Sequence, residues 1–262
     1  ECYDPKTKQF TMSDRCVGMH HLQYDANNVL GFSGPNTQVI GWLDRDKFEK
    51  THDAAASQGW SPFIIDTNGN GKRDAWTEPG QPADPKKDTR FGGGAIGLYG
   101  VSPDPADGSV WGSAMGFPGW VGRYDPKTQL SESYEVPWKD PKAKVHGYGP
   151  RGMDIDRNGV VWMPLSSGHL ASFDRRKCTG PLNGPNATGQ QCPEGWTLYP
   201  LPGPQFQQVK DSGSAEASYY TWVDQHNTSG LGANTPLATG NENEGLIALV
   251  DGKFAILRVP YP

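Results

Sequence analysis

The residues from Asp66 to Asp74 have the types and the spacing of a calcium-binding loop. Side chains that carry oxygen stand at places 1, 3, 5 and 9, glycine stands at place 6, and the carbonyl group of place 7 is available; the loop residues are Asp66, Asn68, Asn70, Gly71, Lys72 and Asp74. Calcium takes six or more oxygen ligands, which this pattern can supply. Place 12 is Thr77 and not glutamate, so we expect Glu78, one residue later, or water to complete the shell.

The sequence around this loop favours a structural calcium ion over a calcium sensor. WSPFII before the loop is typical of a strand, and TEPGQPADP after it would break a helix. The loop therefore does not belong to a helix–loop–helix unit, and we expect a bound Ca²⁺ ion to stabilise an insertion. The alternative interpretation is an Asn-Gly-rich turn that binds nothing.

The four cysteines form two pairs with equal spacing. Cys2 and Cys16 are 14 residues apart, and so are Cys178 and Cys192, and neither pair has the C-x-x-C spacing of a zinc or redox site. Two local disulfides are the simplest interpretation, each worth roughly 3 kcal/mol in the chain-entropy model. Four free thiols are the alternative. Because disulfides persist in oxidising compartments, we expect a periplasmic or extracellular protein.

A repeated strand pattern is expected to position these sites. Its clearest unit, residues 149–177, contains an alternating strand, a tight turn, a second strand with a tryptophan, and a third strand that ends in Phe-Asp. The same order recurs over residues 19–47 and 97–128, and a shorter copy covers residues 245–259. An aromatic or apolar residue followed by Asp recurs at Asp4, Asp44, Asp125 and Asp174.

These aspartates are separated by 40, 81 and 49 residues, which indicates a period of 40 to 50. Such a period with four strands per unit is typical of a β-propeller blade, whereas an antiparallel sandwich is the alternative. We therefore predict an all-β fold, a single β-propeller domain over residues 1–262 with about five to six four-stranded blades. Residues 48–91 are predicted to be an insertion or degenerate blade with the metal loop, and residues 203–243 a long loop excursion. Because a propeller closes when its first and last blades meet, we expect a fragment of a longer chain, with up to about seven blades in all.

Composition supports this class and disfavours others. The chain has 34 glycines and 23 prolines, too many for a helical bundle, and its 9 Trp, 10 Tyr and 9 Phe residues are too many for a disordered chain. A net charge of −5 does not point to nucleic acid. No apolar run approaches the ~18 residues of a membrane-spanning helix.

The repeat resembles the blades of the virginiamycin B lyase-like, or streptogramin lyase-like, β-propeller family. The resembling residues are GPRGMDID at 149–156, NGVVW at 158–162 and the closing Phe173-Asp174. The resemblance is good over residues 146–177 and fair over 19–47 and 97–128. It implies an architecture in which alternating strands pack blade against blade, Asn-Gly forms the hairpin and Trp fills the layer between blades.

The resemblance also implies candidate residues at the mouth of a central channel. The family's enzyme opens its streptogramin substrate by magnesium-assisted elimination with histidines and a glutamate. The first strand of each blade lines the axis, so residues near its start are expected to meet: His20, Tyr99, Arg151 and Glu244, together with His21 and His146. Such a set is capable of acid–base catalysis, and a ring of solvated polar side chains is the alternative. Ser166, Ser167 and His169 are interpreted as turn residues.

We expect a secreted or periplasmic propeller that binds a small-molecule or protein ligand on its loop face or channel mouth and is stabilised by Ca²⁺. One alternative is an active metal-dependent lyase, with Mg²⁺ as its cofactor, that acts on a cyclic ester or a polysaccharide. Another is a structural blade array, with other domains of the same polypeptide as partners. A His/Glu cluster with a metal at one channel mouth would distinguish the enzyme from the binding protein.

Overall fold

A computed structural model describes residues 2–13, 18–34, 37–92, 97–138, 140–205, 208 and 213–258. In this part of the chain, most of the regular structure is antiparallel β-sheet. Three sheets have four strands each, and a seven-stranded sheet contains a fourth set of four antiparallel strands; we call these four sets blades 1 to 4. None of the helices among these residues is long and apolar enough to cross a membrane. The predicted fold class, an all-β protein built from four-stranded blades, is confirmed.

Blades 1 and 2 come from the N-terminal half of the chain. Blade 1 consists of β3 (His21–Tyr24), β4 (Val29–Gly34), β5 (Thr37–Asp44) and β6 (Gln58–Pro62), with α1 (Arg45–Thr51) and α2 (Ala54–Ser57) between β5 and β6. Blade 2 consists of β10 (Gly100–Pro103), β11 (Val110–Ala114), β12 (Trp120–Tyr124) and β13 (Ser131–Glu135). Three short strands extend it beyond β13: β7 (Ile64–Ile65), β9 (Asp88–Arg90) and β8 (Trp76–Thr77).

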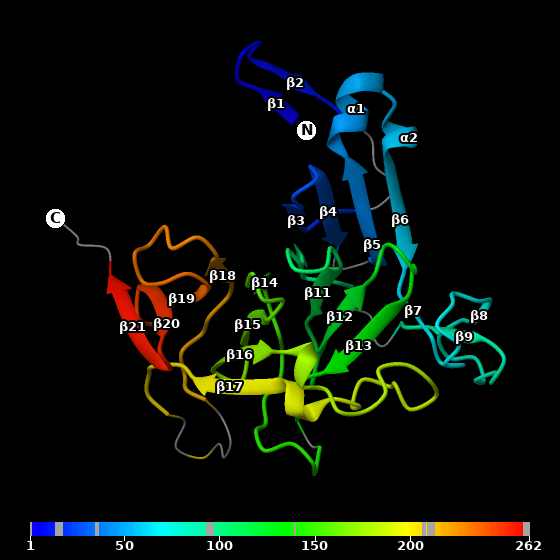
Figure 1. Ribbon diagram of the computed structural model, residues 1–262. Helices are drawn as coiled ribbons and strands as arrows, with labels where there is room; N and C mark the ends of the chain where they lie inside the picture. Colours follow the sequence, from blue (N-terminus) through cyan, green and yellow to red (C-terminus); the bar gives the residue numbers. More distant parts are fainter. Residues whose placement is uncertain are drawn as a thin grey trace.

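Blades 3 and 4 follow in sequence order. Blade 3 consists of β14 (Asp154–Ile155), β15 (Val161–Leu165), β16 (His169–Phe173) and β17 (Trp196–Pro200), with the short 3-10 helices η1 (Arg175–Lys177) and η2 (Pro193–Gly195) between β16 and β17. Blade 4 consists of β18 (Thr221–Asp224), β19 (Thr235–Gly240), β20 (Gly245–Val250) and β21 (Lys253–Arg258). Figure 1 shows the four blades following one another around an arc.

The first strand of each blade lies on the inner side of this arc. β3 contacts β10, β10 contacts β14, and β14 contacts β18. Side chains between neighbouring blades form separate apolar layers. Phe63 and Leu98 lie between blades 1 and 2, and Trp111 and Phe173 lie between blades 2 and 3. Face-to-face packing of blades is therefore the source of the core, as the alternating strands indicated.

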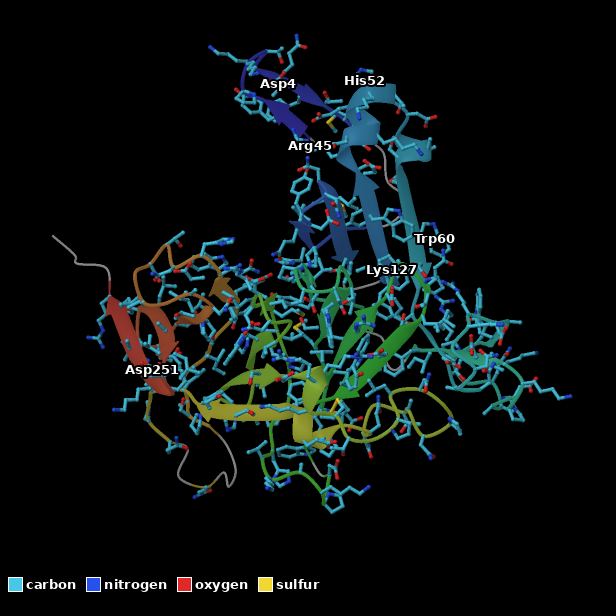
Figure 2. The ribbon with its side chains drawn as sticks, viewed as in Figure 1. Asp4, Arg45, His52, Trp60, Lys127 and Asp251 are labelled. Atoms are coloured by element: carbon cyan, nitrogen blue, oxygen red, sulfur yellow. A yellow bond between two sulfur atoms is a disulfide. The ribbon has the colours of Figure 1, made fainter. Side chains whose placement is uncertain are left out.

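The N-terminal hairpin stands outside the four blades. Among the described strands, β1 (Cys2–Asp4) pairs with β2 (Gln9–Thr11) and with no other. A pocket between this hairpin and α1 is lined by Asp4, Arg45 and His52, which lie near one another in Figure 2.

The number and limits of the blades differ from the prediction. The described residues contain four blades, fewer than the five to six that the spacing indicated. Residues 48–91 form no blade of their own, because β6 completes blade 1 and β7 to β9 extend blade 2. Residues 203–243 are not one long loop, since β18 and β19 lie within them and begin blade 4. The polar composition of that segment concealed both strands.

The repeated aspartate before each outer turn has one structural role. The Oδ1 atom of Asp4, Asp125 and Asp174 accepts a hydrogen bond from the main-chain N–H two residues later, at 2.8, 2.8 and 3.1 Å. Asp44 accepts from the Lys47 N–H at 2.9 Å and caps α1. The repeat thus marks a turn in which a short polar side chain replaces a main-chain partner.

One of the two predicted disulfides lies within the described residues and is confirmed. Cys178 and Cys192 are joined, with an S–S distance of 2.03 Å, and close the connection between β16 and β17. The predicted Cys2–Cys16 pair includes Cys16, which lies outside the described residues.

Candidate functional site

Six side chains from all four blades meet at one end of the inner strands, and we call them the channel cluster. Blade 1 contributes His20 and His21, blade 2 Tyr99, blade 3 Arg151 and blade 4 Tyr219 and Tyr220. All six stand at or just before the start of a first strand. The propeller geometry therefore brings together residues that are up to 200 positions apart in the sequence.

The same main-chain contact positions the cluster in each of the first three blades. The N–H groups of His20, Tyr99 and Arg151 donate to carbonyl groups of the second strand of their own blade, at 2.6, 2.6 and 3.1 Å. In blade 4 the carbonyl group of Tyr220 accepts from the Thr239 N–H at 3.0 Å. The backbone that carries these side chains is thus held by the sheets and is not part of a free loop.

Ring contacts connect the cluster across the blades. The ring centroids of His20 and Tyr99 are 4.3 Å apart, and those of Tyr99 and Tyr220 are 5.7 Å apart. Tyr219 lies 6.2 Å from Tyr99, and the guanidinium carbon of Arg151 lies 4.7 Å from the centroid of the Tyr219 ring. The last distance is within the range of a cation–π interaction. Aromatic faces and one cation therefore share this surface.

The environment holds two of these groups in their neutral forms. Burial, and then hydrogen bonding with Tyr220 and Tyr219, raises the pKa of Tyr99 far above its ordinary value. Burial lowers the pKa of His21, whose Nδ1 atom lies 2.9 Å from the carbonyl oxygen of Val101. At neutral pH the Arg151 guanidinium provides positive charge to the cluster, and the Tyr99 phenol remains a hydrogen-bond donor.

An aromatic shelf lies in the connections between β11 and β12 and between β13 and β14. Phe117, Trp138 and Tyr148 form it, with ring centroids 5.0 to 5.1 Å apart. The Phe117 side chain is 66% exposed. The shelf is tied to the start of blade 3 because the Gly149 N–H donates to the Pro118 carbonyl group at 2.7 Å.

Glu244 and His146 do not take part in the channel cluster. Glu244 lies exposed in the turn between β19 and β20, at φ 52°. His146 lies in the connection between β13 and β14. In the described part of the chain, neither side chain forms a hydrogen bond or an ion pair with the cluster.

The sequence did not reveal Tyr219 and Tyr220, because the region around them reads as a polar loop. Their one available signal is the pair of adjacent tyrosines directly before an alternating TWVD segment. Ser167 and His169, interpreted as turn residues, lie in contact: Ser167 Oγ is 3.0 Å from His169 Nδ1, and both residues are buried. The Gly213 N–H donates to the Ser167 carbonyl group at 2.7 Å, so the Gly213–Ser214 segment packs against this pair.

Beneath the cluster, Asp154 connects the inner strands of all four blades. Its carboxylate accepts hydrogen bonds from Gln23 Nε2 of blade 1 at 3.3 Å, Ser102 Oγ of blade 2 at 3.0 Å and the Val223 N–H of blade 4 at 2.8 Å. The residue is 5% exposed. A buried carboxylate with this many donors positions the blades that carry the cluster.

Several residues of the predicted calcium loop converge. Asp66 is 2% exposed, and its two carboxylate oxygens accept from the N–H groups of Gly69, Asn70 and Gly71 at 2.7 to 3.1 Å. The side chains of Asn68 and Asn70 both contact Asp74 Oδ2, at 2.9 and 2.6 Å. These two hydrogen bonds lower the pKa of Asp74. Places 1, 3, 5 and 9 therefore form one compact turn.

Glu78 points to other partners. It accepts from Trp76 Nε1 at 2.9 Å and pairs with Arg90 at 3.1 Å, and these contacts lower its pKa. Lys72 donates its N–H to Asn70 Oδ1 at 2.8 Å. As the side chains lie, no group of three His, Cys, Asp or Glu residues poised to hold a metal occurs among the described residues. A calcium ion here would draw on amide and main-chain oxygens as well as carboxylates.

Comparison with known proteins gives similarity of structure but not of sequence. No protein-family model and no curated protein matches the sequence. Virginiamycin B lyase from Staphylococcus aureus is similar in structure, with a TM-score of 0.53 and 13% identity over 94% of this chain and 57% of that one. A catalytically inactive histidine-to-alanine variant of that enzyme, solved with quinupristin, has a TM-score of 0.53 and 12% identity over 97% of this chain and 59% of that one.

A streptogramin B lyase structure has a TM-score of 0.50 and 12% identity, and covers 92% of this chain. The chain spans 54 to 59% of the length of these three structures. Over more than nine-tenths of its length, the chain has the β-propeller architecture of the virginiamycin B, or streptogramin B, lyases.

Proposed function

We propose that this chain is a ligand-binding β-propeller whose ligand occupies the channel cluster. The observation that carries the proposal is the convergence of His20, Tyr99, Arg151 and Tyr219 from four different blades. The function of a β-propeller depends on the side chains that its site presents and not on the fold itself, and these side chains are capable of binding a ligand. They combine a cation, phenol donors and aromatic faces in one place.

The chemistry of the surface favours a ring-bearing ligand with an anionic or carbonyl-rich group. Arg151 offers planar donors to such a group, and Tyr219 offers its ring face. The exposed Phe117 and the rest of the aromatic shelf would cover apolar rings of a larger ligand. A cyclic ester peptide meets this description, and the quinupristin named with one similar structure is the natural first probe.

Calorimetric titration with quinupristin, and separately with a uronate oligosaccharide, tests the proposal. We expect wild-type protein to bind one of these probes, and Arg151→Ala and Tyr219→Ala to weaken binding by about tenfold or more, since buried aromatic and Arg anchors dominate such surfaces. Lys253→Ala removes an exposed cation from β21 and should bind like the wild type. Equal affinity in all four proteins would contradict the proposed site, and no binding by the wild type would favour the structural blade array.

A lyase is the second candidate, because His20 is exposed at the cluster and its Nδ1 atom lies 3.0 Å from the Tyr99 carbonyl oxygen. His20 would remove a proton beside a carbonyl group and Arg151 would stabilise the developing negative charge. The magnesium that such an enzyme would use does not fit this cluster, because Mg²⁺ prefers carboxylate oxygens and the six cluster side chains include none. The binding function is therefore the better supported of the two.

Turnover assays separate the two candidates. A panel of cyclic-ester and uronate substrates would be incubated with the protein, with and without added Mg²⁺. The lyase candidate requires turnover by the wild type and its loss in His20→Ala without unfolding. If the wild type turns over none of these substrates, the enzymatic candidate fails and the binding propeller stands.

We also propose that one Ca²⁺ ion stabilises the loop formed by Asp66, Asn68, Asn70, the Lys72 carbonyl group and Asp74. The compact arrangement of places 1, 3, 5 and 9 supports it. Elemental analysis should find about one calcium per chain, and chelation should lower the thermal midpoint. Absence of calcium together with an unchanged midpoint would refute the proposal.

We also propose a periplasmic or extracellular location for this protein. The Cys178–Cys192 disulfide supports it, because such bonds are rare in reducing compartments. Mass spectrometry of unreduced peptides from the native source should recover the linked pair. Recovery of both cysteines as free thiols would argue against this location.

A further inference from the structure

Asp88 is a fully buried carboxylate beneath the predicted calcium loop. It is 0% exposed and lies at the start of β9, where its N–H donates to the Ala75 carbonyl group at 3.0 Å. Its Oδ2 atom accepts from the Asp74 N–H at 2.7 Å, which places the carboxylate against the last ligand position of the loop. Its Oδ1 atom is buried and has no hydrogen-bond partner among the described residues.

The Asp88 carboxylate lies near two other carboxylates, those of Asp66 and Asp74, and near the guanidinium of Arg73. In the described part of the chain, none of these three carboxylates forms an ion pair. The guanidinium of Arg73 instead lies 5.3 Å from the Trp76 ring and donates to Ser61 Oγ. A buried carboxylate oxygen without a partner is costly, and a bound cation would remove that cost.

Glu78 is not free to complete the site. Its two carboxylate oxygens are held by Trp76 and Arg90, at 2.9 and 3.1 Å. Moving Glu78 to the loop would break both contacts, whereas Asp88 already touches Asp74. The ligand expected at place 12 of the loop therefore has a better candidate, which comes 22 residues after Asp66.

We propose that Asp88, and not Glu78, supplies the carboxylate oxygen that completes the calcium site from outside the loop. The inference rests on the calcium ion proposed above. An oxygen-only donor set of carboxylates, amides and a main-chain carbonyl group suits a hard cation with six or more ligands, which is Ca²⁺. Asp88 would also link the loop to β9, so that binding fixes the extension of blade 2.

Calcium titration of matched variants tests the assignment. Asp88→Asn keeps an acceptor for the Asp74 N–H but removes the negative charge, and Glu78→Gln makes the same change at the other candidate. We expect wild type and Glu78→Gln to bind Ca²⁺ alike, and Asp88→Asn to lose at least the ~10–100-fold in affinity that removal of a supporting group costs. The gain in thermal midpoint on adding Ca²⁺ should vanish in Asp88→Asn only.

Each other outcome identifies what fails. If wild type binds no Ca²⁺, the proposed ion and this inference both fall. If all three proteins bind equally, or if only Glu78→Gln weakens, the ion stands and the role of Asp88 is overturned. Should Asp88→Asn not fold, a crystal structure of the calcium-loaded wild type decides: an Asp88 oxygen at ~2.3–2.6 Å from the ion supports the assignment, and its absence from the shell overturns it.

Discussion

Replacement of Asp154 by alanine should destabilise the protein more than any exposed substitution. The Asp154 carboxylate accepts from Gln23 Nε2, Ser102 Oγ and the Val223 N–H, and also from its neighbouring Ile155 N–H at 2.9 Å. Alanine would leave the Ser102 hydroxyl and the Val223 N–H buried without this acceptor. At about 1–3 kcal/mol for each of these two unpaired buried groups, the expected loss in the free energy of unfolding is about 2–6 kcal/mol.

Urea unfolding followed by tryptophan fluorescence measures this loss. Asp154→Asn provides a graded comparison, because its amide keeps one acceptor oxygen and should lose about half as much. Glu242→Ala removes an exposed carboxylate in the turn after β19 and should change the free energy of unfolding by less than about 0.5 kcal/mol. A loss below about 1 kcal/mol for Asp154→Ala would refute the idea that this carboxylate holds the inner strands together.

Three further predictions follow from individual contacts. Replacing both Cys178 and Cys192 by serine should lower the free energy of unfolding by about 2–4 kcal/mol, which urea unfolding measures. The loop that the two cysteines close contacts the predicted calcium loop, so the replacement should also weaken Ca²⁺ binding in a calcium titration. An unchanged affinity for Ca²⁺ would disprove this link. Burial lowers the pKa of His169 from 6.5 to about 4. Between pH 6.5 and pH 4 the folded protein therefore binds fewer protons than the unfolded protein, and the free energy of unfolding should fall as the pH is lowered through this range. The loss of stability on lowering the pH should be smaller in His169→Gln. An equal loss in the variant and the wild type would contradict a role for His169. Gly152→Ala would place a methyl group in the Tyr220 ring, so it should disturb the channel cluster and weaken ligand binding in calorimetry, while an unaffected affinity would count against a role for Tyr220.

The strands of blade 3 show how far local sequence predicts structure in this chain. Alternation in MDID and the Asn158-Gly159 turn determine β14, β15 and the hairpin between them, because side-chain direction and tight turns depend on neighbouring residues only. The aspartate markers likewise predict turns, since Asp125 and Asp174 each bond to a main-chain N–H two residues away. The equal cysteine spacing predicted Cys178–Cys192, whose loop is local as well.

The blade limits required contacts that are distant in sequence. β7 pairs in parallel with β13, more than 60 residues later, and so residues 48–91 were divided between two blades. In blade 4, β18 and β19 come from a segment with few aliphatic residues, and its pairing register became visible only in the folded sheet. Polar strands are buried here by neighbouring blades, which local hydrophobicity cannot report.

The sequence by itself determined the class of the fold, the turns, one disulfide and four members of the channel cluster. Each of these depends on residues within one blade or on a repeated position at the start of a first strand. Only the tertiary structure decided that Tyr219 and Tyr220 join that cluster while Glu244 does not. It also decided that Asp88 contacts the predicted calcium loop while Glu78 pairs with Arg90. The physical reason is that these choices depend on how blades pack and which charges already have partners. Both are properties of the folded chain, and no local spacing encodes them.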